Sequence, residues 1–369
     1  MSMTETTTRD DTLDVALGER YYRGSRDAEA DAVESIVGLI HRRIKERFES
    51  GEGAAHRDAH AGDNGCVKAY FRVNADLDKS LHHGVFQPGK EYRAWIRFSN
   101  GNSRPKGSRW PDARGMAIKL VGVDGEKLLP DERGTQDFIL ISSPTFFCDD
   151  PDRYRSTLDD FLSESTLTQW LAVKHLKPRE ALLAIRANVK WITNPLFQQY
   201  WSMTPYRLGP PGTLAVKYTA RPRLRPKRLL SDYVLGPCRS ILTFISPGFS
   251  LKNEMNNTLA GHEMWFDFCV QKFHDKSSTP IEDTTVEWKE RDAPLCPVAK
   301  IIIPVQDIMS AERAVFCEDL SFSPWHGLPE HRPLGFTNRV RRRAYLEIST
   351  LRHGLNRRSR QEPTGDEAV

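Results

Sequence analysis

The sequence has no closely spaced cysteine pairs, no long apolar run and no strong excess of one charge. Its six cysteines, at positions 66, 148, 238, 269, 296 and 317, form no CxxC pair. A disulfide framework or a zinc knuckle requires closer, repeated spacings. We therefore expect reduced thiols and a cytoplasmic location.

Membrane and nucleic-acid partners are not expected either. No apolar run approaches the roughly 20 residues that span a bilayer, and the opening MSMTETTTRDDTLD lacks the basic and then apolar order of a secretory signal. The formal net charge of +4 over 369 residues is close to balance. The charge therefore gives no general argument for binding nucleic acid.

Short segments rich in β-branched and aromatic residues are abundant, and turn residues separate them. They lie at 66–73, 92–99, 115–123, 137–142, 213–220, 240–246, 263–271 and 299–305. Because several follow one another without a helix between them, they predict an antiparallel sheet closed into a barrel.

Helical periodicity marks three other regions. Apolar residues recur every three or four positions over 29–50, a helical stretch is expected around 152–202, and a final helix is expected near 337–352. From these patterns we expect the chain to have three parts. Residues 1–50 form a loose arm and a helix, residues 51–355 form one α+β domain, and residues 356–369 form a disordered basic tail.

The final helix carries Arg341, Tyr345 and Arg352, spaced by four and seven residues. At about 100° per residue, these side chains fall within roughly 40° of one another on one face. An arginine one turn from a tyrosine favours the phenolate, which is a strongly donating ligand for ferric iron. An exposed basic helix is the alternative interpretation.

Two further clusters contain candidate site residues. In HRDAHAGDNG, Arg57 precedes His60 by three residues, and histidine is the usual acid–base group near neutral pH. The alternative is a loop histidine bonded to water.

In YRAWIRFSN, Arg97 and Ser99 share one face of a strand. An arginine pointing into a barrel needs an anionic partner, such as a carboxylate-bearing cofactor, because a buried unpaired charge is costly. The alternative is that this face meets solvent.

Five motifs occur in the order in which they stand in catalases: HRDAHA, RFSNGN, DARGMAIKLVGVDG, SSPTFFCDDP and RRRAY with Arg352 beyond it. Over roughly residues 50–160 and 330–355 the chain resembles the catalase superfamily, and its length resembles that of the compact, haem peroxidase branch. The resemblance implies the catalase fold, a closed antiparallel β-barrel with flanking helices. It also implies haem b buried between the barrel and the last helix.

The resemblance implies a role for each candidate residue. Tyr345 would be the axial iron ligand, held as phenolate by Arg341. His60 would be the distal acid–base group, with Ser99 hydrogen-bonded behind it. Three further arginines would pair with the haem propionates: Arg57, Arg97 and Arg352. A homo-oligomer is expected by the same analogy.

One position departs from the catalase pattern. Where catalases carry an asparagine before Thr-Pro, this chain has Ser142 in SSPTFF. A hydroxyl donates one hydrogen bond and an amide donates two, so both oxygens of hydrogen peroxide would be held less well. We therefore expect Ser142 to favour peroxidase over catalase activity. If Ser142 is not the distal partner, Thr135 and Gln136 are the next candidates.

The sequence thus predicts a haem-dependent peroxidase or catalase acting on hydrogen peroxide or organic hydroperoxides. His60 would move a proton from the inner to the outer peroxide oxygen, and a second peroxide or a small organic electron donor would supply electrons. Two alternatives remain open. One is a fatty-acid hydroperoxide isomerase or dehydratase resembling allene oxide synthases, and the other is a non-enzymatic haem carrier or sensor.

Overall fold

The computed structural model describes residues 12–368 except 52, 58–59, 61, 102–110, 131, 162–171, 191 and 224–248. Within the described residues, nine strands form one sheet. The strands are β1 (Asp63–Val73), β2 (Glu91–Asn100), β3 (Arg114–Val121), β4 (Thr135–Ile141), β5 (Tyr200–Trp201), β6 (Tyr206–Arg207), β7 (Ala215–Pro222), β8 (Met264–Lys272) and β9 (Leu295–Ile303).

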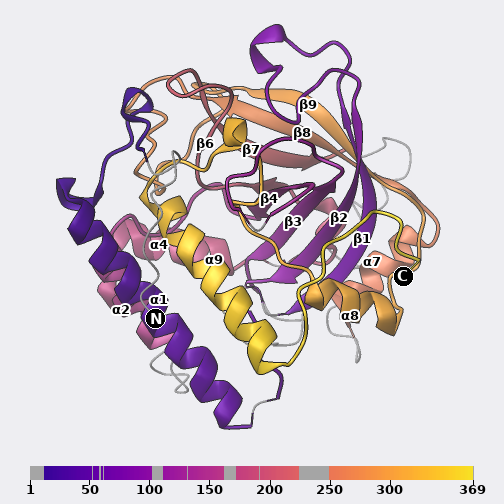
Figure 1. Cartoon of the computed structure of the whole chain (residues 1–369), viewed down its shortest axis with the longest axis horizontal. Helices are drawn as coiled ribbons and strands as arrows, with labels where there is room; N and C mark the ends of the chain where they lie inside the picture. The colour runs from indigo at the N-terminus through magenta and orange to yellow at the C-terminus, as the bar shows by residue number, and fades with distance from the viewer. Residues whose placement is uncertain are drawn as a thin grey trace.

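The pairings close eight of these strands into a barrel, which can be followed in Figure 1. The short strand β5 pairs with β4 on one side and with β7 on the other, and so joins the ends of the series β4-β3-β2-β1-β9-β8-β7. The pairings are antiparallel, and β6 extends the sheet along β7. The predicted fold class, a closed antiparallel barrel with flanking helices, is therefore confirmed.

Apolar and aromatic side chains fill the interior of the barrel. Phe71, Phe138, Tyr218 and Phe268 lie with ring centroids between 4.8 and 6.0 Å apart. Aromatic rings at such separations stabilise a core beyond the area that they bury. The interior of the barrel is thus a packed core, and the candidate site lies against its outer wall.

Arg97 points out of the barrel, so the prediction of an inward arginine was wrong. On β2, Ile96 and Phe98 belong to the core inside the barrel, and alternation along the strand turns Arg97 and Ser99 outward. Both outward side chains are nevertheless buried, with 3% and 4% of their surface exposed. Because covering segments bury this outer face as deeply as the core, the sequence of β2 does not reveal which side is inward.

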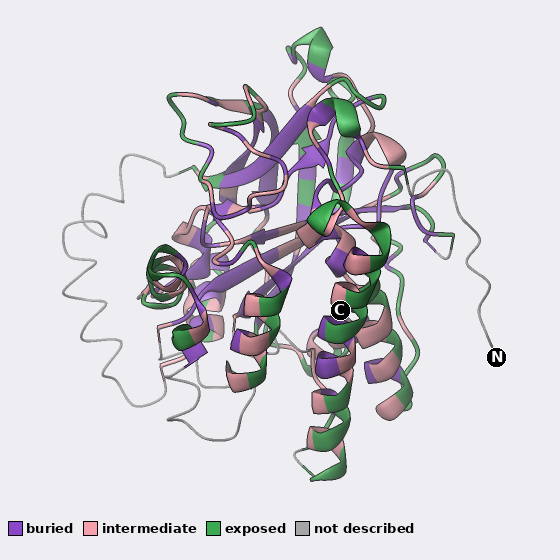
Figure 2. Cartoon of the chain, turned by 90° about the vertical axis from the view of Figure 1, so that its left-hand side faces the viewer, coloured by how far each residue is buried: buried purple, intermediate pink, exposed green. Residues whose placement is uncertain are grey.

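Helices cover the barrel on one side (Figures 1 and 2). Those of the described residues are α1 (Arg26–Glu49), α2 (Pro151–Phe161), α4 (Pro178–Asn188), α7 (Leu251–Leu259), α8 (Ala311–Asp319) and α9 (Phe336–Leu355). α1 packs along α9, where Ile36, Ile40 and Ile44 meet Val340 and Leu351. The spacing of four residues puts the three isoleucines on one face of α1, which fixes α9 from its outer side.

Most predicted elements are present. The predicted strands correspond to β1–β4 and β7–β9, except that 240–246 lies outside the described residues. The first and last predicted helices are α1 and α9, and the stretch 152–202 contains α2 and α4 but ends in β5. α7 and α8 were not predicted. Each has nine residues, which is too short for a clear helical period.

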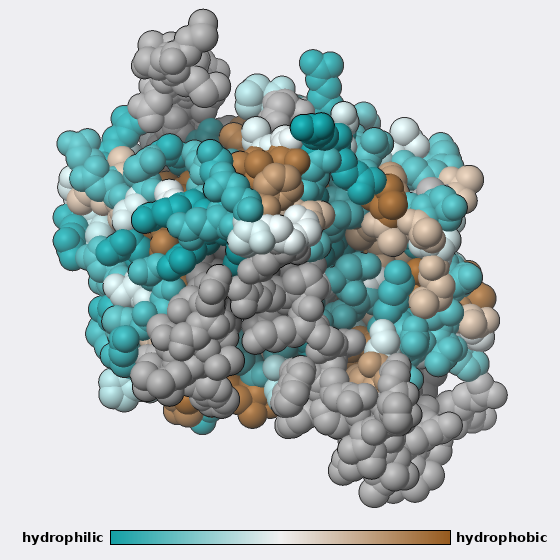
Figure 3. All heavy atoms as spheres, turned by 90° about the horizontal axis from the view of Figure 1, so that it is seen from below, coloured by the Kyte–Doolittle hydropathy of each residue, from teal (hydrophilic) through white to brown (hydrophobic). Residues whose placement is uncertain are grey.

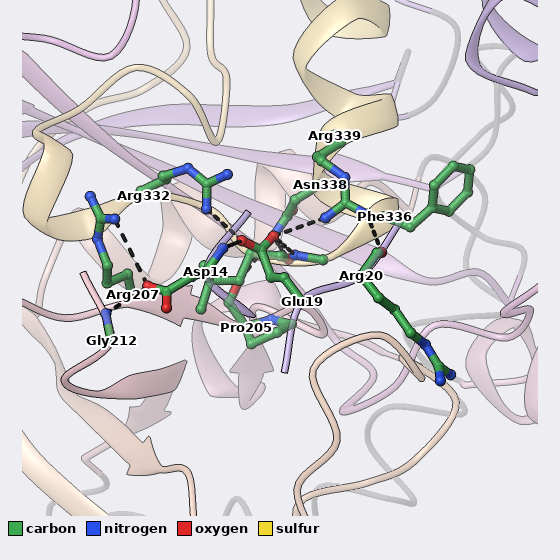
Figure 4. Close-up of polar contacts among 12 residues, drawn as sticks. Asp14, Glu19, Arg20, Pro205, Arg207, Gly212, Arg332, Phe336, Asn338 and Arg339 are labelled. Carbon is green, nitrogen blue, oxygen red and sulfur yellow. Dashed lines mark hydrogen bonds and ion pairs between the residues drawn. The ribbon is translucent and has the colours of Figure 1, made fainter. Parts of the chain in front are cut away.

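Residues 12–25, the described part of the segment before α1, are bound to the start of α9, where a loose arm was expected (Figure 4). The buried carboxylate of Glu19 accepts hydrogen bonds from Arg332 and Arg339, each at 2.8 Å, and from the backbone N–H of Gly335 at 2.7 Å. Gly335 has φ +86°, and a Cβ there would come within 2.8 Å of the carbonyl oxygen of Ile281, so the turn into α9 requires glycine. The polar sequence of this arm did not reveal its buried anchor.

The described part of the C-terminal segment, residues 356–368, which was expected to be a disordered tail, makes contacts with the rest of the chain. Its Gln361 donates a backbone hydrogen bond to Asp319, and Glu367 accepts one from the indole of Trp95 at 3.0 Å. Arg360 contacts the buried Glu132. The charged side chains that made the tail look disordered are therefore partners for groups on the barrel.

The surface seen in Figure 3 is mainly hydrophilic where described residues face the viewer, and its hydrophobic side chains form separate patches. Among the described helices, none combines the length and the apolar character that crossing a membrane requires.

Candidate active site

The face of α9 toward the barrel carries Arg341 and Tyr345. Arg341 Nη2 donates to the Tyr345 hydroxyl at 3.2 Å, and its guanidinium lies 5.3 Å from the centre of the phenol ring. Arg341 Nη1 is held by Thr204 and Asn338, both at 3.2 Å. Burial alone lowers the pKa of Arg341, but Tyr345 and the nearby Tyr206 outweigh burial and raise it. This arginine therefore remains a cation beside the phenol.

His60 lies over β2 and β3. Its Nδ1 is 3.0 Å from Ser99 Oγ, and its backbone carbonyl accepts a hydrogen bond from Arg97 Nη2 at 2.9 Å. Ser99 pairs with Gly115 across the two strands. A Cβ on Gly115 would come within 2.5 Å of Ser99 Oγ and 2.6 Å of His60 Nδ1. Only glycine at position 115 leaves room for the imidazole to contact the serine.

The histidine and the tyrosine helix face the same region. Burial, followed by the charges of Arg97, Arg341 and Arg114, lowers the pKa of His60 to about 4. One of these cations, Arg341, is the same group that bonds to Tyr345. His60 is therefore neutral at neutral pH, and a neutral imidazole can accept a proton.

Three of the predicted arginines gather around one carboxylate, that of Glu318 at the end of α8. Glu318 accepts hydrogen bonds from Arg57 Nη1 at 2.6 Å and from Arg352 Nη1 at 3.0 Å. Burial, followed by the charge of Arg97, lowers the pKa of Arg57. Arg97 also adds to the effect of Arg57 and Arg352, which lower the pKa of Glu318 against burial. We call Arg57, Arg97 and Arg352 the arginine cluster. The next carboxylate, Asp319, is paired with Arg358 at 2.9 Å. Among the described residues, the cluster therefore has three positive charges against the one negative charge of Glu318.

Ser142 follows β4 beside the histidine region. β4 pairs with β3 so that Ile141 faces Gly115, the residue beneath His60. Ser142 Oγ accepts the backbone N–H of Arg114 at 2.9 Å, which leaves the hydroxyl hydrogen free to donate elsewhere. The position of Ser142 is compatible with a distal partner of His60.

Thr135 and Gln136 lie at the opposite end of β4, roughly 20 Å away along a seven-residue strand. The Thr135 hydroxyl bonds to Glu132, and the Gln136 amide oxygen accepts the backbone N–H of Leu328. They are therefore not alternatives to Ser142.

A cavity of about 220 Å³ lies on the flank of α9. Tyr345 forms part of its wall, together with hydroxyl and imidazole groups: Ser321, Ser323, His326, Ser349, Thr350 and His353. This volume is below the range of roughly 300–1,000 Å³ that is usual for pockets that bind drug-sized ligands. The cavity can hold water or a small polar molecule beside the tyrosine.

The residues present fit a haem group. Arg97 Nε and Arg352 Nε are buried and have no hydrogen-bond partner among the described residues, and such donors require acceptors. Two propionates would provide these acceptors and would also balance the two surplus positive charges of the arginine cluster. The phenol oxygen of Tyr345 is the ligand type that a tyrosinate-bound ferric haem uses.

Sequence reasoning missed Glu318 and Gly115. Gly115 stands inside the DARGMAIKLVGVDG motif, and only the strand pairing shows that it makes room for His60. Glu318 belongs to the unpredicted helix α8. The one available signal was indirect: several arginines expected to be buried require a carboxylate somewhere in the chain.

The barrel with its covering helices is the catalase fold. A fungal catalase superimposes with a TM-score of 0.61 at 17% identity, over 84% of this chain and 62% of the catalase. Catalase A from Saccharomyces cerevisiae gives 0.61 at 16% identity, over 86% and 67%, and a bacterial catalase gives 0.56 at 18% identity, over 86% and 62%. The chain therefore spans between 62% and 67% of the length of these catalases. No family model matches the sequence, and a search of curated proteins found no significant relative.

Proposed function

We propose that this protein binds haem b through Tyr345 and reduces peroxides with electrons from a small organic donor. The observation that carries the proposal is the arrangement around Arg341. This cation donates to the Tyr345 hydroxyl at 3.2 Å and also contributes to the lowered pKa of His60. An iron ligand and an acid–base histidine that share one neighbouring cation are suited to act on a molecule bound between them.

When bound, haem would supply a ferric iron that accepts the peroxide and takes up the oxidising equivalents. The protein's own contribution is the movement of a proton. With Nδ1 donating its hydrogen to Ser99 Oγ, Nε2 of His60 is the basic nitrogen. It takes the proton from the inner peroxide oxygen and returns it to the outer oxygen, which leaves as water or as an alcohol. Ser99 fixes the ring in the orientation that this transfer requires.

Ser142 supports peroxidase activity over rapid disproportionation of hydrogen peroxide. Its hydroxyl already accepts a hydrogen bond from the Arg114 backbone, so one donor hydrogen remains for the substrate. An amide would offer two. The second hydrogen peroxide, which has to be oxidised in a catalase, is therefore held less firmly than an organic donor that does not depend on this contact.

The test is reconstitution of the purified protein with hemin. We expect a high-spin ferric spectrum of the tyrosinate type, and Tyr345→Phe should lose haem or change that spectrum. Tyr70→Phe is the matched control, since Tyr70 is 42% exposed on β1. Turnover is then measured with hydrogen peroxide, a bulky organic hydroperoxide and a fatty-acid hydroperoxide. An unchanged spectrum and haem content in Tyr345→Phe would contradict the proposed ligand. Isomerisation of the fatty-acid hydroperoxide without donor oxidation would contradict the proposed reaction.

A further inference from the structure

Glu318 gives the arginine cluster an anionic partner that belongs to the chain itself. Burial by itself raises the pKa of Glu318, but Arg57, Arg352 and Arg97 outweigh burial and lower it. The carboxylate is therefore charged at neutral pH. Its two oxygens are each committed to a different guanidinium, at 2.6 and 3.0 Å, so it occupies hydrogen-bonding positions that propionate oxygens would also use.

We propose that Glu318 is a built-in counter-ion that holds the arginine cluster together before haem arrives and lowers the affinity for haem. This inference rests on the haem assignment above. In the haem-free protein, Glu318 contacts Arg57 and Arg352 at 2.6 and 3.0 Å and also feels the charge of the buried Arg97. In the loaded protein, two propionates share the same cations. Glu318 therefore stabilises the haem-free state more than the loaded state, and a group with that preference weakens binding.

The backbone at the end of α8 adds to the hold of this carboxylate, so loss of its charge should weaken the cluster without disrupting it. Arg57 Nη2 also donates to the carbonyl oxygens of Glu318 and Leu320, at 3.2 and 2.8 Å. Arg352 Nη1 donates to the same Glu318 carbonyl at 2.8 Å. These carbonyls hold both guanidiniums in place when the side chain is changed to an amide, which retains one acceptor oxygen.

The inference is tested with Glu318→Gln, and Glu312→Gln is the matched control. Glu312 is exposed in the first turn of the same helix. Haem-free proteins are titrated with hemin, and the thermal unfolding of haem-free and loaded forms is compared. We expect Glu318→Gln to unfold at a lower temperature than wild type without haem, to recover most of the difference with haem, and to bind hemin about tenfold more tightly, equal to about 1.4 kcal/mol. Glu312→Gln should bind hemin as wild type does.

The direction of the change separates this role from a merely structural one, because damage to the site would weaken haem binding. Unchanged or weaker binding in Glu318→Gln would overturn the inference and leave the haem assignment intact. Failure of the wild type to bind hemin would overturn both.

If haem-free Glu318→Gln does not fold, haem release to apomyoglobin is measured from the loaded protein and from Glu318→Asp, whose shorter side chain weakens both contacts. Both variants should release haem more slowly than wild type, and faster release would overturn the inference.

Discussion

At the scale of single residues, Ser142 separates two kinds of peroxide chemistry. Ser142→Asn keeps an acceptor for the Arg114 N–H, at 2.9 Å in the wild type, and adds donors toward the substrate. We expect hydrogen peroxide to be disproportionated several-fold faster in Ser142→Asn. The gain should be smaller than the roughly 3–4 kcal/mol of one well-placed active-site donor, because a water beside the serine can partly replace the amide.

Oxygen release and donor oxidation would be compared at matched haem content. Ser156→Asn is a control for the substitution itself, because the Ser156 hydroxyl donates to the carbonyl oxygen of Asp152 at 3.0 Å within its own helix, α2. Rapid oxygen release by the wild type would show that Ser142 does not slow the disproportionation of hydrogen peroxide. An equal rate in Ser142→Asn would show that residue 142 does not face the peroxide.

His60 provides a prediction that does not depend on haem. Its pKa is lowered to about 4 by burial and three arginine charges, so the imidazole should stay neutral as the pH falls from 8 to 5 and take up its proton only near 4. NMR titration of the haem-free protein, with the signal assigned by comparison with His60→Gln, measures this directly. Titration near the ordinary value of 6.5 would mean that the cations do not surround the ring.

At the scale of elements, the start of α9 depends on the segment before α1. Burial raises the pKa of Glu19, but Arg332 and the backbone N–H groups of Asp14 and Gly335 outweigh it and lower the pKa. Glu19→Gln removes a buried carboxylate charge that contacts Arg332 and Arg339, each at 2.8 Å, and removing one member of a buried ion pair costs roughly 3–5 kcal/mol. Denaturant unfolding should show a loss in this range at pH 7.

The control for Glu19 is Glu34→Gln, which removes an exposed partner of Arg343 and should cost less than about 1 kcal/mol. The lowered pKa of Glu19 also sets a pH dependence. The advantage of the wild type over Glu19→Gln is complete above the ordinary glutamate pKa of 4.5 and disappears as the pH falls through the lower, folded-state value. A difference that persists unchanged at strongly acid pH would contradict this assignment.

The same elements show which parts of the structure could be predicted from the sequence. Strands and long helices could be predicted because their apolar spacing reflects burial on one side. The order of the motifs also indicated which residues would meet, and His60 with Ser99 and Arg341 with Tyr345 do so at 3.0 and 3.2 Å. The outward face of Arg97 and the contact of Glu318 could not be predicted. Both depend on segments that pack over the outside of the barrel. No local sequence pattern in β2 or α8 indicates which segments these are.

At the scale of the whole molecule, the site depends on contacts between opposite ends of the described chain. Glu19 and Arg332 are 313 residues apart, and Ala55 and Asn356, which bond to each other at 2.8 Å, are 301 apart. Closing such long loops costs conformational entropy before the new contacts can stabilise the chain. We therefore expect these pairings to form late in folding. His60 and Tyr345, in the two halves of the candidate site, are also far apart in the chain, so we expect them to come together at the same stage as these pairings.

Late assembly has a consequence for when haem can be captured during folding. If hemin is present from the start of refolding, tryptophan fluorescence should report collapse of the barrel first, and the haem absorbance band should develop only with the slowest phase. Hemin added after refolding should bind without that delay. Capture of haem in the first phase would instead mean that the tyrosine helix reaches the histidine strands before the two ends of the chain have met.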